Sequence, residues 1–189
     1  MTDITNKLEQ TPTLKFDRGY KWLHWSMAFL VLLMLLALVG FAQEMTVEER
    51  MTMLTGHSSI GTIISLLLLV RITKRFVKKS PRPQHIMPRW QQLAAKSTQF
   101  GLYFCMVFIP VTGYLTARFH ELPVKVFGNF DISQATQQSY NQATFDTLRL
   151  AHELGIKLIM VLLVLHIGAV FYHRLVKKDG VLASMTTAK

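Results

Sequence analysis

The chain has 189 residues, a formal net charge of +10 and a hydrophobic share of 50%. Its mean hydropathy of +0.28 is high for a soluble domain that carries such a charge, so a soluble nucleic-acid-binding domain is disfavoured. Cys105 is the single cysteine, which excludes an internal disulfide and a cysteine-ligated iron–sulfur cluster. We interpret it as a small apolar packing residue.

Four apolar stretches predict helices that cross a membrane: residues 22–41, 56–72, 99–117 and 149–172. Each approaches the roughly 20 residues that a crossing helix needs. The second is the weakest, because its uninterrupted apolar core of residues 60–70 would also suit a soluble core helix. Its place among three longer spans favours a crossing. No small-residue cleavage site follows the first span, so we interpret that span as a retained helix.

These stretches predict an all-α integral membrane protein, a four-transmembrane-helix bundle that occupies residues 21–175. A polar tail is expected at residues 1–20 and a basic cytoplasmic tail at residues 176–189. Loops are expected at residues 42–55, 73–98 and 118–148, and the last of these is long enough to cap one end of the bundle.

Basic residues gather on one side of this predicted topology. Fifteen of the lysines and arginines precede the first span, follow the fourth span or lie in loop 73–98, and only three lie in the other two loops. This asymmetry follows the positive-inside rule and predicts that both termini are cytoplasmic. A multi-pass membrane protein is therefore expected. Nucleic-acid binding would leave the alternation of charge with the spans unexplained.

Four histidines lie in the apolar stretches: His24, His57, His152 and His166. Ionisable groups in such spans are costly and are functional candidates. His152 and His166 are 14 residues apart, which places them on nearly the same helix face and about 21 Å apart along the axis. The alternating direction of the helices brings His24 to the depth of His166, and His57 to the depth of His152.

Paired imidazoles in such a bundle favour two b-type haems with bis-histidine iron. Zinc or copper would favour a tighter cluster with carboxylate or thiolate ligands. For any single histidine, a hydrogen-bonded polar residue is an equally good explanation, whereas four histidines at matching depths favour iron ligands, His24 with His166 and His57 with His152. Bis-histidine ligation leaves no open position on the iron and therefore favours outer-sphere electron transfer.

Two glycines follow histidines by about one helical turn, Gly61 after His57 and Gly155 after His152. A glycine there would let a flat macrocycle approach the backbone. Small residues also line helix contacts in membranes, so packing explains these glycines equally well.

Two arginines are candidates to bind haem propionates, since a guanidinium fork suits a carboxylate. Arg71 shares the face of His57 at the cytoplasmic depth, which favours the propionate role, and a snorkelling anchor is the alternative. Arg149 lies one turn before His152 and is the weaker candidate. The role of Lys157 is left open. The remaining histidines are interpreted as surface residues: His85, His120 and His173.

The chain resembles the bacterial cytochrome b561 family, which is related to the cytochrome b subunits of membrane hydrogenases. The matching segments carry the four histidines, Arg71 and the third span: KWLHWSMAFL, TGHSSIGTII, LLLLVRITKRF, FCMVFIPVTGYL and LAHELGIKLIMVLLVLHIGAVFYH. The resemblance covers residues 16–181 and implies the same four ligands and two b haems. Many members have a histidine near the start of the third helix, where this chain has Gln99.

The resemblance implies transfer of single electrons between a periplasmic donor and membrane quinone, with ubiquinone as the expected partner. Its sharpest form is an enzyme, a superoxide:ubiquinone oxidoreductase. Because one fold serves several donors, a membrane anchor that links quinone to a separate periplasmic redox protein is the alternative. An alternative of another class is a transporter that uses its histidines for protons or metal.

Overall fold

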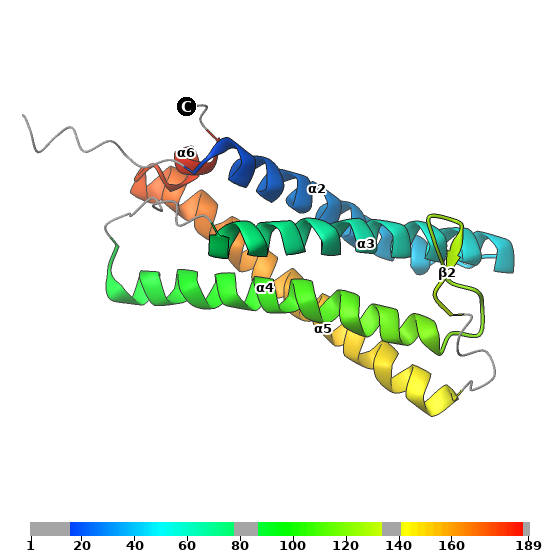
Figure 1. The fold of residues 1–189 in the computed structure, drawn as a ribbon. Coiled ribbons are helices and arrows are strands. Elements are labelled where there is room, and N and C mark those ends of the chain that lie inside the picture. The colour runs from blue at the N-terminus through cyan, green and yellow to red at the C-terminus, as the bar shows by residue number, and fades with distance from the viewer. Residues whose placement is uncertain (1–15, 78–86, 134–140, 187–189) are drawn as a thin grey trace, which may run out of the picture.

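The computed structural model describes residues 16–77, 87–133 and 141–186. Four long helices dominate it: α2 (Arg18–Phe41), α3 (Val47–Val77), α4 (Arg89–Arg118) and α5 (Gln142–Tyr172) (Figure 1). Each is long and apolar enough to cross a membrane. A π-helical turn (His173–Lys177) continues α5 and leads to the short helix α6 (Val181–Thr186). The predicted four-helix membrane fold is confirmed.

The helices are longer than the apolar stretches that predicted them. Helix α3 begins inside the segment expected to be loop 42–55, and α4 begins inside the expected loop 73–98. Helix α5 likewise begins before residue 148. The loop boundaries were therefore wrong, because hydropathy marks the part of a helix that lies in hydrocarbon and not its polar ends.

Local capping explains where three of the helices begin. The Asp17 side chain accepts a hydrogen bond from the Tyr20 N–H at 3.0 Å, and the Asn141 side chain accepts one from Thr144 at 3.0 Å. At α3, Thr46 and Glu49 bond reciprocally: the Thr46 N–H donates to the Glu49 carboxylate at 2.8 Å, and the Glu49 N–H donates to the Thr46 hydroxyl at 3.3 Å. These contacts satisfy N–H groups that a helix start leaves unpaired.

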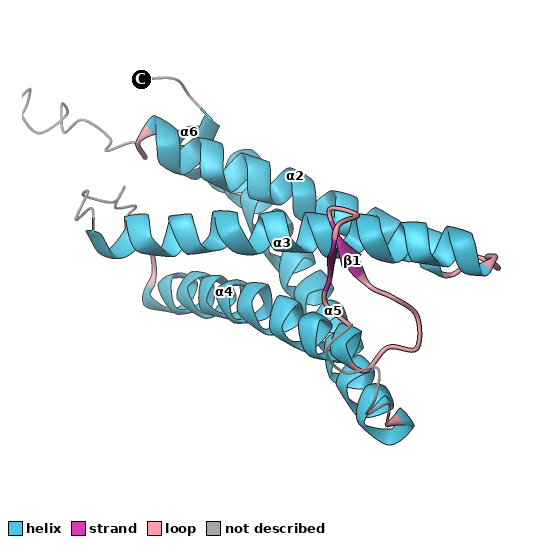
Figure 2. Ribbon diagram, turned by 45° about the vertical axis from the view of Figure 1, so that its right-hand side comes forward, coloured by secondary structure: helices cyan, strands magenta, loops and turns pink. Residues whose placement is uncertain are grey.

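The bundle consists of two helical hairpins, α2 with α3 and α4 with α5, and these pairs make the closest helix contacts. Helix α5 runs obliquely to the other three long helices (Figure 1, Figure 2). Fully buried apolar side chains are few and lie along the inner faces, among them Leu23, Ile64, Cys105 and Ile159. Cys105 is thus a packing residue, as interpreted.

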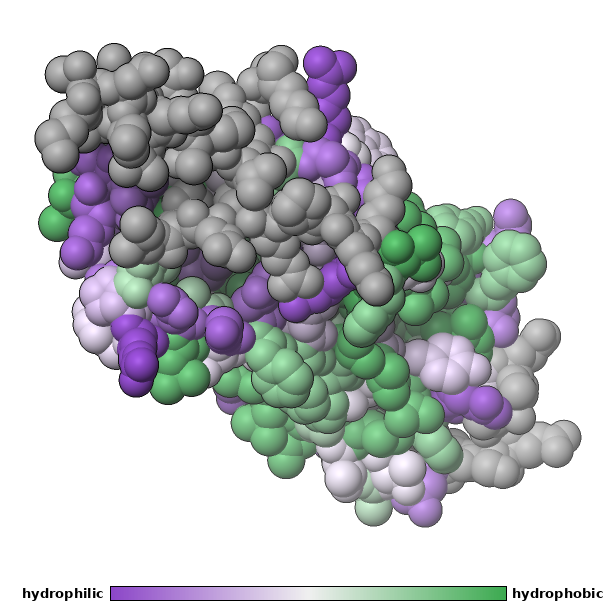
Figure 3. All heavy atoms as spheres, turned by 60° about the vertical axis from the view of Figure 1, so that its left-hand side comes forward, coloured by the Kyte–Doolittle hydropathy of each residue, from purple (hydrophilic) through white to green (hydrophobic). Residues whose placement is uncertain are grey.

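The outer surface of the bundle is apolar over its middle. Leu36, Phe100 and Val164 are each about two-thirds or more exposed, at 67%, 75% and 71%. Hydrophobic side chains cover the middle of one face, and hydrophilic ones gather toward its ends (Figure 3). Such a large exposed apolar surface fits contact with lipid.

A small β-hairpin lies at the end of the bundle where α3 and α5 begin. We name this end of the bundle the hairpin end, after the β-hairpin. Strands β1 (Lys125–Val126) and β2 (Phe130–Asp131) pair antiparallel. The turn places Phe127 and Gly128 at φ of 53° and 73°, a region that glycine adopts without strain. Two serines of α3 hold the hairpin: the Ser58 hydroxyl donates to the Lys125 carbonyl at 2.6 Å, and the Phe127 N–H donates to the Ser59 hydroxyl at 2.7 Å.

The opposite end of the bundle, where α2 begins and α6 lies, we call the terminal end (Figure 1). The Trp25 indole N–H donates to the Met185 carbonyl at 3.2 Å and ties α6 to α2. The basic tail predicted at residues 176–189 therefore includes a docked helical turn. Residues 1–15 of the predicted polar tail lie outside the described residues.

Candidate functional site

The four predicted histidines form two pairs, and each pair joins the two helical hairpins. At the terminal end, the rings of His24 on α2 and His166 on α5 have centroids 6.3 Å apart and planes at 70°. At the hairpin end, the rings of His57 on α3 and His152 on α5 have centroids 6.1 Å apart and planes at 72°. The oblique course of α5 lets one helix supply a histidine to both pairs.

These separations suit a metal held between two imidazoles. A ring nitrogen lies about 1.1 Å from the ring centroid, and a metal–imidazole bond is about 2 Å long. One metal in line between two rings therefore requires centroids about 6 Å apart. Both pairs have this spacing, with ring planes at 70° and 72°, and the same distance also occurs when two rings pack edge to face.

Each pair offers two imidazole nitrogens, which fits a metal that receives its other ligands from a macrocycle. Within the three described stretches of chain, no group of three or more His, Cys, Asp or Glu side chains could hold a metal ion. Two imidazoles alone do not complete a protein zinc site, which ordinarily has four ligands. Two axial imidazoles do complete a haem iron, because the porphyrin supplies the other four nitrogens.

The ring of His152 is held by the backbone of α4. Its Nδ1 lies 2.9 Å from the Ile109 carbonyl oxygen and 3.3 Å from the Thr112 hydroxyl. A carbonyl can only accept, so Nδ1 carries the hydrogen and donates it. The Nε2 atom of His152 then keeps its lone pair, which is the form that a metal ligand needs.

The ring of His57 has a different environment. Its Nδ1 is buried and, among the residues that the structure describes, has no hydrogen-bond partner. The ring of Phe41 contacts it edge-on, with centroids 5.4 Å apart. A buried polar atom without a partner is uncommon, and at a candidate cofactor site it suggests that something further is meant to bind nearby.

Arg71 lies beside the terminal-end pair, at the depth predicted for it. Its Nη1 is 3.3 Å from His24 Nδ1, and its Nε donates to the Tyr103 hydroxyl at 3.0 Å. The guanidinium also lies 5.2 Å from the centre of the Tyr20 ring. Arg71 is therefore held within the bundle by residues of α2 and α4, which a freely snorkelling anchor would not require. Its propionate role stays a prediction.

Two further cations of α3 lie near Arg71. Lys74 pairs with Asp17 at 2.6 Å, and the Arg75 guanidinium lies 5.4 Å from the centre of the Tyr103 ring. This cluster of positive charge belongs to the terminal end only. It would suit acidic groups of a cofactor bound at His24 and His166.

The two predicted glycines have unlike surroundings. A side chain added at Gly61 would meet only the Met34 methyl group, at 4.0 Å, so the space beside it is open. A side chain added at Gly155 would meet Ile109 at 3.0 Å and Phe108 at 3.1 Å. Gly155 thus permits close packing of α5 on α4, which is the packing explanation. A macrocycle contact for either glycine stays a prediction.

The remaining candidates lie away from the paired rings. Arg149 is 61% exposed in its side chain and pairs with Glu153 at 2.9 Å, so its observed partner is not at the histidine pair. Lys157 and Gln99 are exposed on α5 and α4. Their contribution to a propionate or quinone site stays a prediction.

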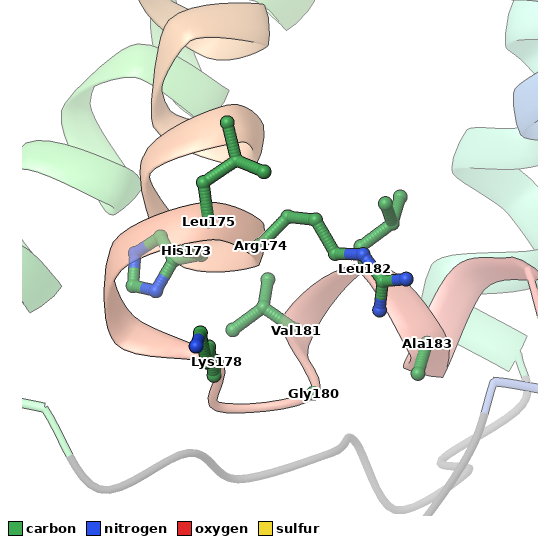
Figure 4. A pocket seen from close by; sticks show the side chains of 8 residues that line it. All are labelled: His173, Arg174, Leu175, Lys178, Gly180, Val181, Leu182 and Ala183. Atoms are coloured by element: carbon green, nitrogen blue, oxygen red, sulfur yellow. The ribbon is translucent and has the colours of Figure 1, made fainter.

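Of the three histidines that were interpreted as surface residues, the two that the structure describes, His120 and His173, do not join the pairs. His120 is half-buried after α4 and accepts a hydrogen bond from the Leu122 N–H at 2.9 Å, and burial lowers its pKa below the usual value. His173 lines a pocket beyond α5 and pairs with Asp179 (Figure 4). His85 lies outside the described residues.

Sequence reasoning missed the residues of α4 that surround His152. Ile109 acts through its main-chain carbonyl, for which the side chain gives no signal. Gly113 lies directly against the His152 ring: a side chain added there would come within 2.9 Å of its Cε1 atom. The only available signal was a glycine and a threonine in the middle of an apolar span, in the segment PVTG.

Comparison with known proteins agrees with this arrangement. The family model for prokaryotic cytochrome b561 matches residues 15–188. The chain is 30% identical over 132 residues to cytochrome b561 homolog 2 of Escherichia coli (strain K12), and the match covers 68% of each chain. The family is one of haem b membrane cytochromes that transfer electrons, as the paired imidazoles suggested. This chain, with four membrane-spanning helices and histidines paired across them, belongs to the prokaryotic cytochrome b561 family.

Proposed function

We propose that this protein is a di-haem cytochrome that passes single electrons across the bacterial inner membrane, between a periplasmic donor and ubiquinone in the membrane. Superoxide is the donor that we propose first. The observation that carries the proposal is the presence of two imidazole pairs with metal-compatible spacing, 6.3 Å and 6.1 Å, at opposite ends of one helical bundle.

In this proposal His24 and His166 hold one haem, and His57 and His152 hold the other. Bound haem b supplies an iron that accepts and releases one electron reversibly. The two imidazoles of each pair would hold this iron from the protein side and would keep water and oxygen from binding to it. The chain thereby restricts each site to outer-sphere transfer.

The segment of α5 between the pairs separates the two sites with apolar side chains. Fourteen residues of helix set the pairs about 21 Å apart along the axis. Ile159 lies between them and is 95% buried, and Leu162 packs against α4 at Gly101. These two apolar side chains occupy part of the region between the proposed sites.

The distribution of charge supports the proposed orientation. The terminal end carries Arg71, Lys74 and Arg75 on α3, and most of the other basic residues flank the same end in the sequence. By the positive-inside rule this end faces the cytoplasm. The hairpin end then faces the periplasm, and the His57–His152 pair is the one nearer to a periplasmic donor.

One observation favours the alternative, an anchor that exchanges electrons with a periplasmic redox protein. The β1–β2 turn presents Phe127 and Phe130, which are 50% and 67% exposed. Ser58 and Ser59 fix this hairpin to α3 directly beside His57. Exposed aromatic side chains are enriched where proteins dock, so the turn would suit such a partner.

The first experiment is a reduced-minus-oxidised spectrum of the purified protein, with haem counted per polypeptide. We expect b-type bands and two haems per chain. A non-redox transporter would show no such bands. Protein that stays colourless when supplied with haemin would overturn the proposal.

The second experiment distinguishes the two donors by stopped-flow reduction of the haems with superoxide, with and without added ubiquinone. Reduction faster than a buffer blank, followed by reoxidation that depends on quinone, supports the oxidoreductase. Reduction no faster than the blank rejects superoxide as the donor and leaves the anchor, for which deletion of the β1–β2 turn should slow reduction by a periplasmic carrier protein.

A further inference from the structure

We propose that three residues of α4 form a cradle that positions His152 and sets the ligand strength of the hairpin-end site. The cradle consists of Ile109, through its carbonyl oxygen, with Thr112 and Gly113. This inference rests on the proposed function, because it concerns the proposed ligand His152. The three residues would act on the metal only through the ring of His152, so they are positioning residues.

The cradle follows from the geometry of one helical turn. The carbonyl of Ile109 points along α4 toward Gly113, four residues later, as in any helix. The His152 ring lies against Gly113, where an added Cβ would be 2.9 Å from Cε1 and 3.1 Å from Nδ1. Real Cβ atoms do not approach so closely, so only glycine at position 113 lets the ring reach the Ile109 oxygen at 2.9 Å.

The Thr112 hydroxyl completes the cradle from the same turn. It donates to the Phe108 carbonyl at 2.8 Å and lies 3.0 Å from the Ile109 oxygen. Its oxygen is 3.3 Å from His152 Nδ1, within reach of a second, weaker interaction with the same N–H. The N–H of His152 therefore faces two acceptors, and rotation of the ring about its Cβ–Cγ bond would lose both.

This hydrogen bond has a chemical consequence for a metal ligand. Donation from Nδ1 to a carbonyl fixes the tautomer and raises the basicity of Nε2. A more basic ligand stabilises the oxidised metal relative to the reduced metal. His57 has no such partner at its Nδ1 among the described residues. The two ligands of one site are therefore unequal, and His152 is the stronger donor.

The first test uses two glycines of α4 that are equally crowded. In Gly113→Ala the new methyl group meets the His152 ring, and in Gly101→Ala it meets Leu162 at the same 2.9 Å. We expect Gly113→Ala to weaken retention of one haem by about 10- to 100-fold, the usual effect of losing a partner of a metal-bound histidine. Gly101→Ala should keep both haems, because the leucine can change rotamer. Equal loss in the two variants would overturn the proposal.

The second test measures the hydrogen bond itself by chemical rescue. In His152→Gly, added imidazole can ligate the iron and donate its N–H to Ile109, whereas 1-methylimidazole can ligate but cannot donate. We expect the haem with 1-methylimidazole to have the higher midpoint potential. In His57→Gly, whose native ring has no partner at Nδ1, the two ligands should give the same potential. A difference of equal size at both positions would contradict the cradle.

The outcomes separate failure of the cradle from failure of the proposed function. If the unaltered protein binds no haem, the proposed function fails and the cradle fails with it. If the unaltered protein binds two haems, but both glycine variants behave alike and the two rescuing ligands are equivalent at His152→Gly, only the cradle fails.

Discussion

The two histidine pairs share the same chemistry but differ in what surrounds them. At the hairpin end, a neutral backbone carbonyl accepts from His152 at 2.9 Å. At the terminal end, the Arg71 guanidinium lies 3.3 Å from His24, with Lys74 and Arg75 nearby. A hydrogen-bond acceptor strengthens a histidine ligand and favours the oxidised metal, whereas a neighbouring cation favours the state with less positive charge.

In the proposed function, these unlike surroundings would give the two haem sites different reduction potentials. We expect the terminal-end haem to have the higher reduction potential and the hairpin-end haem the lower. Electrons would then move downhill from the hairpin end to the terminal end, which is the direction from periplasm to cytoplasm in the proposed orientation. The substitutions that follow test whether the surroundings of each pair cause this difference in potential.

The largest effect is expected from removing a ligand. His57→Ala or His152→Ala should lose the hairpin-end haem and keep the other, so that haem per polypeptide falls from two to one. His24→Ala or His166→Ala should do the reverse. The potential of the remaining haem identifies which one is kept. Loss of both haems from any single change would contradict the pairing.

The next effect concerns the cation beside the terminal-end pair. Arg71→Gln removes the charge that lies by His24, and should lower the reduction potential of that haem by an amount equivalent to about 1 kcal/mol or more. The control is Arg75→Gln, whose guanidinium lies over Tyr103 and not at His24. A redox titration measures both. An equal shift of the two haems, or a shift as large in Arg75→Gln, would show that the asymmetry does not come from Arg71.

A third prediction separates helix stability from the sites. Asp17 caps α2 and pairs with Lys74, so Asp17→Ala should destabilise the terminal end by about 1 kcal/mol. Asn141→Ala removes the cap of α5 at the hairpin end and should cost a similar amount. Thermal unfolding of the haem-loaded protein measures both. Each variant should keep two haems, and a variant that lost one would tie the cap to the site.

The smallest effect is expected from the threonine of the cradle. Thr112→Val keeps the shape of the side chain but removes the hydroxyl near His152, and should raise the potential of the hairpin-end haem by the equivalent of less than about 1 kcal/mol. Thr116→Val removes a hydroxyl one turn further along, which donates to the Thr112 carbonyl at 2.8 Å. It should leave both potentials unchanged. A shift in Thr116→Val that matched Thr112→Val would assign the effect to the helix and not to the histidine.

The number of spans and the pairing of the histidines could be predicted from the sequence. A helix rises a fixed 1.5 Å per residue, so counting residues from each span boundary gives depth, and consecutive spans reverse direction. Those two facts were enough to match His24 with His166 and His57 with His152. Counting also placed Arg71 at the depth of the terminal-end pair, where the structure has it.

The contacts of each imidazole depend on how the helices pack, which the sequence does not give. The depth of a residue in the membrane does not give the rotation of its helix about the axis, and so it does not identify the neighbouring side chains. A main-chain acceptor such as the Ile109 carbonyl cannot be predicted from the pattern of side chains. Gly155 and Gly113 look alike in the sequence, yet one contacts Phe108 and Ile109 and the other the His152 ring. The helix ends also lay beyond the apolar stretches, because polar turns outside the hydrocarbon are held by caps and packing and not by hydropathy.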